Sequence, residues 1–244
     1  AVAFLIRIAA DPHHPHRTAA LAEVPAPARA RHLGVASRAE LLLHRTGIRQ
    51  VDCDDYGFEV TGYPAGWSVA AARAAITADA ALLLPLLHDP APATRIRAAY
   101  ALATVTDLEG TVRTALRARF TAEPAPDVRA ALLLATAEIT RARPHPPTTA
   151  LLRECWQDRT RALEVRLAAA IGWLCLTDET APDDLHAAVG GLATDERART
   201  MDDLPWMAAA SGSGETGLQR CLRTMLHPEQ PDPRQYDDPW APRS

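Results

Sequence analysis

Three carboxylates stand within four residues at Asp52-Cys53-Asp54-Asp55, the densest group of potential metal ligands in the chain. Carboxylate oxygens are the ligands that hard cations such as Ca²⁺ prefer. An EF-hand loop beginning at Asp52 would need a glutamate at its twelfth position, where the chain has Tyr63. We therefore interpret this cluster as a solvated acidic turn and expect no metal there.

Two further sets of metal-binding residue types have unsuitable surroundings. His13, His14 and His16 lie in a proline-rich corner, with no cysteine or second histidine group at ligand spacing. The four cysteines form no Cys-x-x-Cys pair. Cys155 and Cys175 fall on predicted apolar helix faces, where cysteine acts as a small hydrophobic residue. The sequence therefore predicts no metal site and no cofactor.

A Gly-x-Gly-x-x-Gly pattern occupies residues 212–217. A dinucleotide site needs a strand before this pattern and a helix after it, but the preceding residues 206–210 do not read as a strand. The chain has no lysine, so a Walker A loop is absent, and it has no Gly-x-Ser-x-Gly nucleophile elbow. We interpret residues 212–217 as a connector, predict no catalytic residue, and expect a protein that is not an enzyme.

The composition excludes several classes of protein. Hydrophobic residues make up 48% of the 244 residues and the net charge is only −4, so the chain is not intrinsically disordered. No run of 18 apolar residues occurs, which argues against a membrane span, and the acidic balance argues against a general nucleic-acid binder. The apolar residues 1–7 lack the basic leader of a secretory signal, and we expect a cytoplasmic protein.

One eight-residue pattern occurs three times: a β-branched residue, arginine, any residue, alanine, two further residues, leucine or isoleucine, and a small residue. The copies begin at Ile96, Val128 and Val165, so their arginines are 32 and 37 residues apart. Apolar runs precede the copies at residues 82–87, 112–120 and 151–156, and corners lie at residues 89–92, 123–126 and 157–161. Each unit therefore predicts two antiparallel helices joined by a short corner.

The pattern places two small side chains on one face of each second helix. Such a helix pair buries its apolar face only by stacking on the next pair, as in solenoids. Residues 83–103, 116–139 and 151–174 resemble HEAT repeats, including the short bacterial HEAT-like repeats related to those of phycobilisome lyases. The resemblance implies an all-α fold, a right-handed α-solenoid of stacked antiparallel helix pairs that forms one domain over residues 1–226.

Weaker units flank the three strong ones. Residues 4–8 and 17–21 fit a helix pair with a corner at residues 13–16. Residues 185–192 and 218–226 fit a degenerate unit at the other end of the domain.

Two segments do not fit the repeat. Residues 46–66 are punctuated by glycine and proline, and residues 51–62 have the alternation of a short hairpin. We interpret residues 46–66 as an irregular insertion, with a functional loop and a simple connector both open. Residues 227–244 are proline-rich and predict an extended tail.

In HEAT solenoids the second helices line the concave face, where partners bind. On each second helix, the face opposite the core carries the repeat arginine and the positions three, four and seven beyond it. The predicted binding stripe consists of Arg97, Tyr100, Thr104, Arg129, Thr136, Arg166 and Trp173. Arginine and aromatic residues are typical interface anchors. For the three arginines a structural role is the alternative, in which each one hydrogen-bonds an Asp or a carbonyl of the adjacent unit.

We predict a non-catalytic scaffold that binds another protein or a peptide through this concave face. A nucleic-acid-binding module of the alkylpurine DNA glycosylase type is the alternative, and a positive groove with an Asp beside paired tryptophans would favour it. The His-Glu steps of the HEAT-type deoxyhypusine hydroxylases are absent. A structural fragment of a longer chain is the third hypothesis, which an exposed apolar helix face near residue 1 would favour.

Overall fold

The computed structural model describes residues 1–29, 37–38, 41–42, 67–190, 194–211 and 215–227. These residues form thirteen α-helices and two short 3₁₀ helices with no β-strand among them, so the predicted all-α class is confirmed. The helices are α1 (Val2–Ala10), α2 (Arg17–Glu23), η1 (Pro27–Arg29), α3 (Trp67–Ala78), α4 (Ala80–Leu83), η2 (Leu84–His88), α5 (Pro92–Leu102), α6 (Glu109–Ala122), α7 (Pro126–Ala142), α8 (Pro146–Gln157), α9 (Leu163–Leu176), α10 (Asp183–Gly190), α11 (Asp195–Met201), α12 (Pro205–Ala210) and α13 (Gly217–Leu226).

The predicted corners separate helices as expected. Proline begins α5 and α7, and the residue before it is extended in both cases. Proline suits the first turn of a helix because its missing N–H would have no partner there. The three predicted apolar runs lie in α4 with η2, in α6 and in α8, and the weak first unit corresponds to α1 and α2.

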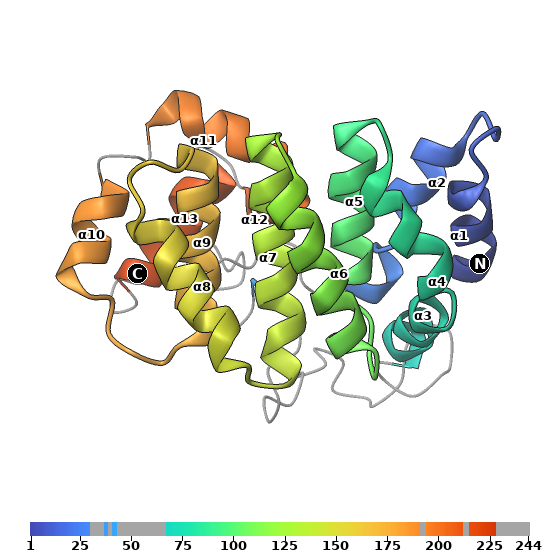
Figure 1. Ribbon diagram of the computed structural model, residues 1–244, viewed down its shortest axis with the longest axis horizontal. Coiled ribbons are helices and arrows are strands. Elements are labelled where there is room, and N and C mark those ends of the chain that lie inside the picture. The colour runs from blue at the N-terminus through green and yellow to red at the C-terminus, as the bar shows by residue number, and fades with distance from the viewer. Residues whose placement is uncertain (30–36, 39–40, 43–66, 191–193, 212–214, 228–244) are drawn as a thin grey trace, which may run out of the picture.

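The second helices of the predicted pairs lie beside one another. α2 contacts α5, α5 contacts α7, and α7 contacts α9, so they follow each other across the molecule (Figure 1). We call α5, α7 and α9 the inner row. The partners η2, α6 and α8 pack against α5, α7 and α9 respectively.

Small buried side chains let the inner row pack closely. Ala99, Ala131 and Ala168 are completely buried. Gly172 of α9 has no room for a side chain, because an added Cβ would lie 3.0 Å from the Cβ of Ala137 on α7. The packing of α9 is so complete that every residue from Val165 to Cys175 is buried.

The C-terminal helices add a further layer rather than a simple end unit. α13 packs against α11, α12 and α9, while α10 packs against α8 and α9. The predicted pairing of residues 185–192 with 218–226 is therefore wrong, since α13 has α12 as its principal partner. The contact between α12 and α13 is close at Gly217, where an added Cβ would lie only 1.8 Å from the carbonyl oxygen of Met207.

Several predicted features lie outside the described residues. They are the irregular insertion at 46–66 with its hairpin near 51–62, the acidic cluster at 52–55, residues 212–214 of the glycine pattern, and the tail from 228 to 244. Among the described residues, no single helix combines the length and hydropathy needed to cross a bilayer. Residues 67–78 and 80–88 meet that test only together, as a pair bent by 62°.

Candidate functional site

Most of the predicted binding stripe is buried inside the chain. Thr104 is fully buried, Thr136 is 3% exposed and Arg166 is 8% exposed. The two threonine hydroxyls donate to backbone carbonyls of their own helix, at Ala101 and Leu132. The expectation of an exposed stripe is therefore wrong at these positions, because other segments of the chain pack over the inner row.

Tyr100 illustrates this covering. The Arg29 guanidinium lies 3.7 Å from the centre of the Tyr100 ring, and the Trp206 ring meets it edge-on at 4.7 Å. Arg29 also pairs with Glu138 at 2.8 Å, and the indole N–H of Trp206 donates to Glu138 at 2.6 Å. We call these four residues the Glu138 cluster. Burial raises the pKa of the Tyr100 hydroxyl; Glu138 adds to this effect and Arg29 opposes it.

The three repeat arginines differ in their contacts. Arg166 Nε donates to the carbonyl of Trp156 at 3.2 Å, and the Arg129 guanidinium lies 4.8 Å from the centre of the Phe120 ring. Both partners belong to the preceding helix of the same pair, not to the adjacent unit of the structural alternative. Arg97 is half-buried and makes no hydrogen bond or ion pair within the described part of the chain.

In α5 the bonded arginine is Arg95 rather than the predicted Arg97. Arg129 and Arg166 are the fourth residues of their helices, and Arg95 is the fourth residue of α5. Arg95 is 6% exposed and forms two hydrogen bonds with Glu123, at 2.8 and 2.9 Å. The sequence pattern placed the first arginine two residues too late for this role.

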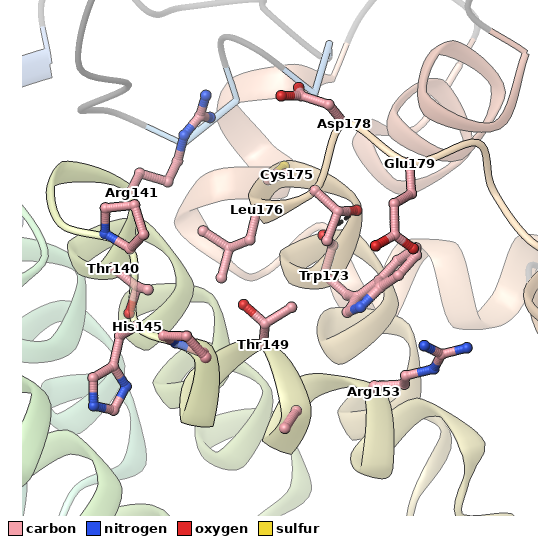
Figure 2. Close-up of a pocket in the computed structure, with 14 residues that line it drawn as sticks. Thr140, Arg141, His145, Thr149, Arg153, Trp173, Cys175, Leu176, Asp178 and Glu179 are labelled. Carbon is pink, nitrogen blue, oxygen red and sulfur yellow. Dashed lines mark hydrogen bonds between the residues drawn. The ribbon is translucent and has the colours of Figure 1, made fainter.

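A cavity of about 580 Å³ opens where α7 ends, α8 begins and α9 ends (Figure 2). We call it the α8–α9 cavity. It is lined by Thr140, Arg141, Pro144, His145, Pro146, Thr149, Ala150, Arg153, Trp173, Cys175, Leu176, Thr177, Asp178 and Glu179. Trp173 belongs to the predicted stripe. It is 2% exposed, so the expectation of an exposed ring is wrong, and its ring meets Trp156 edge-on at 6.2 Å.

Three polar groups of this cavity lack a hydrogen-bond or ion-pair partner among the described residues: the Thr149 hydroxyl, the Arg153 guanidinium and the Glu179 carboxylate. Thr149 and Arg153 are four residues apart, so they share one face of α8. The Arg153 guanidinium lies 5.9 Å from the centre of the Trp173 ring, within cation–π range. Figure 2 shows Thr149 pointing into the cavity, with Arg153 and Glu179 on opposite sides of Trp173.

The cavity is poorly equipped for nucleophilic or metal-dependent chemistry. Burial raises the pKa of the Cys175 thiol to about 12, an effect that Arg141 and Arg38 oppose, so the thiolate is scarce at neutral pH. The His145 Nδ1 lies 2.9 Å from the hydroxyl of Thr148, which is outside the cavity lining. Within the described ranges, no three His, Cys, Asp or Glu side chains form a group that could hold a metal ion.

Sequence reasoning missed Thr149, Arg153 and Glu179. The i, i+4 spacing of the first two was a readable signal for a shared helix face. The segment of residues 177–179 carried no such signal, because its position depends on a tertiary contact. Arg38 donates to the carbonyl of Glu179 at 2.7 Å, and 141 residues of sequence separate them.

No protein-family model matches this chain, and comparisons with curated proteins and with solved structures likewise find no match.

Proposed function

We propose that the chain is a non-catalytic binding protein of the HEAT-like solenoid type, which holds a peptide segment of a partner protein in the α8–α9 cavity. The cytoplasm is the compartment in which we expect it to act. The predicted concave stripe is not the proposed binding site, because the chain itself covers most of that stripe.

The arrangement of polar groups around Trp173 carries the proposal. Ligand cavities are typically about 300–1,000 Å³, largely apolar, with a few polar groups that fix orientation. The α8–α9 cavity has this size, apolar lining residues that include Leu176 and Ala150, and three polar groups without partners among the described residues. A peptide offers carbonyls to which Arg153 and Thr149 can donate and N–H groups from which the Glu179 carboxylate can accept.

The packing of the helices supports the solenoid part of the proposal. Each described pair contacts the next through its second helix, and the contacting surfaces are rich in alanine. This is the nearest-neighbour pattern that repeat architectures use. A solenoid presents clefts between the ends of successive helices, and the α8–α9 cavity is such a cleft.

Peptide display gives a direct test. A random peptide library would be panned against the protein and against Thr149→Trp, in which the indole fills the cavity. Thr114→Trp is the matched control, since Thr114 is exposed on α6 away from the cavity lining. We expect selected peptides to lose at least about tenfold in affinity with Thr149→Trp and to bind Thr114→Trp as they bind the parent protein.

Two outcomes would refute the proposal. One is a library that yields no binding peptide. The other is a set of peptides that bind Thr149→Trp as tightly as the parent. Circular dichroism of both variants checks that the fold is intact.

A nucleic-acid module remains the second candidate because two of its expected features are present. Trp156 and Trp173 form a pair, and Asp178 lines the same cavity as Trp173. However, the two rings are 1% and 2% exposed, so neither offers a face on which a base could stack. Fluorescence anisotropy with labelled single-stranded and duplex DNA at low salt separates the candidates. Binding that Arg153→Ala abolishes would favour the nucleic-acid module, and its absence favours the peptide.

A further inference from the structure

The exposed charged side chains on the two sides of the α8–α9 cavity are of opposite sign. On the α8 side stands Arg153, together with His145 at the start of the helix. Burial lowers the pKa of His145, and the positive charges of Arg113 and Arg117 on α6 lower it further. The α6–α8 side is therefore a local excess of positive charge on a protein whose net charge is −4.

The exposed charges on the other side of the cavity are carboxylates, whereas Arg38 and Arg141 on that side are half-buried or buried and donate to backbone carbonyls. Asp178 and Glu179 follow α9 directly. Arg38 donates to the Glu179 carbonyl at 2.7 Å and to the Met225 carbonyl at 2.8 Å, so this backbone is fixed to the end of α13. The Glu179 side chain is exposed and has no ion-pair partner among the described residues. These bonds hold the backbone of Glu179, and so the base of its side chain, at the rim of the cavity.

We propose that the cavity selects a peptide by the order of its charges: an acidic residue lies on the α6–α8 side at Arg153, a basic residue lies against Glu179, and an apolar residue lies between them against Leu176. This inference rests on the proposed function and names the chemistry of the partner segment. Charge complementarity across the cavity is the observation that carries it.

The charges around the cavity affect the orientation of a bound peptide more than its total affinity. An exposed charge pair contributes little on its own, because water and salt screen it. Reversing the order of charges in a peptide replaces two attractions with two repulsions, so discrimination between the two orders exceeds the contribution of either pair. The apolar lining residues supply binding energy that is indifferent to the order of the charges.

The test uses the same random peptide library with a charge-swapped protein. The double variant Arg153→Glu with Glu179→Arg keeps the net charge and alters two exposed side chains. We expect peptides selected by the parent protein to carry an acidic and a basic residue in one constant order around an apolar residue. Peptides selected by the double variant should carry the opposite order.

One consensus peptide and its charge-reversed counterpart, which have identical composition, then give the magnitude. We expect the consensus order to bind the parent protein at least about tenfold more tightly at low salt, with the preference inverted in the double variant and reduced by added salt. Arg159→Glu, which alters an exposed arginine outside the cavity lining, should leave the preference unchanged.

Failure of this inference is distinguishable from failure of the proposed function. Peptides that lose affinity with Thr149→Trp but show no charge order, or the same order for both proteins, would overturn the charge assignment and leave the binding site standing. Selected peptides that match residues 228–244 would make the occupant a segment of this chain and overturn the assignment to a separate partner. A library without any binder would overturn both proposals.

Discussion

Glu138 of α7 is a fully buried carboxylate that two distant segments of the chain contact. Arg29 and Trp206 both bond its carboxylate, and all three residues are 5% exposed or less. Removal of one partner from a buried pair leaves the other charge without compensation, which costs more than the pair contributes. The stability of the protein should therefore be unusually sensitive to this one position.

We predict that Glu138→Leu lowers the free energy of unfolding by about 3–5 kcal/mol, because Arg29 stays buried without a counter-charge. Urea unfolding followed by circular dichroism measures the change. The control is Arg143→Gln, whose 4.0 Å contact with Asp107 is largely exposed and should contribute less than about 1 kcal/mol. Equal effects of the two substitutions would contradict the prediction. Adding Arg29→Met to Glu138→Leu should recover part of the loss.

Glu123 makes stability depend on pH in the acidic range. Burial raises the pKa of its carboxyl, but hydrogen bonds from Arg95, from the Ala125 N–H and from Arg119 outweigh that effect and place the pKa below the ordinary value of 4.5. A lowered pKa in the folded state means that the carboxylate stabilises the fold above the unfolded-state pKa. That contribution is lost as the pH falls through the folded-state pKa.

We therefore predict that Glu123→Gln is less stable than the parent at pH 7 and that the difference shrinks as the pH falls below about 4. Thermal unfolding across this range measures it. Glu154→Gln serves as the exposed comparison, since its contact with Arg161 is 3.4 Å long and its side chain is 69% exposed. A difference that stays constant down to acidic pH would show that the Glu123 ionisation is not the cause.

At the scale of helices, the contact between α12 and α13 depends on a glycine. The N–H of Gly217 donates to Asp202 and to Ser211, both at 2.9 Å, and the Met207 carbonyl occupies the place of a side chain. Thr216 caps the same helix end through a reciprocal contact with Gln219. The start of α13 is consequently fixed against backbone that has little freedom to move.

We predict that Gly217→Ala destabilises the protein by about 1–3 kcal/mol or more, since α13 must move away from α12 to admit a methyl group. Gly110→Ala in α6 is the control, because no atom lies within 4 Å of the added Cβ and alanine favours helix. Chemical denaturation should show a loss for the first variant and no loss for the second. A neutral Gly217→Ala would contradict the close approach.

Sequence patterns predicted individual helices better than they predicted helix faces. Pro92 and Pro126 marked helix starts, and apolar periodicity marked α6, α8 and α9, because both signals are local. The face of the inner row that we expected to be open is covered by Arg29 and Trp206, which come from opposite ends of the chain. No local pattern specifies such a long-range contact, so the predicted binding stripe and the C-terminal helix pair failed, while the three strong helix pairs did not.

Across the whole molecule, Arg38 joins segments that are far apart in sequence. Its guanidinium bonds the carbonyls of Glu179 and Met225, and its own carbonyl accepts from Arg141 at 3.0 Å. The rim of the α8–α9 cavity is thus connected to α7 and to the end of α13. The composition and the repeat pattern carried no indication of this connection, since arginines are spread along the chain.

We predict that Arg38→Ala increases amide hydrogen exchange in residues 177–182 and at the end of α13, and lowers stability by about 1–3 kcal/mol. Arg97→Ala is the matched control, because Arg97 makes no hydrogen bond or ion pair within the described residues. Selected peptides should bind Arg38→Ala more weakly, since Glu179 loses its fixed place. Unchanged exchange in residues 177–182 would show that Arg38 does not hold the rim.

The two hydrogen bonds of Arg38 also bear on synthesis of the protein. A ribosome makes the chain from residue 38 towards residue 225, so α7, α8 and α9 are translated before the Met225 carbonyl exists to accept its bond. During translation, the backbone at residue 179 on the rim of the α8–α9 cavity would therefore not yet be connected to α13. The protein should therefore become able to bind a ligand only after α13 has left the ribosome, and not gradually as each helix is made.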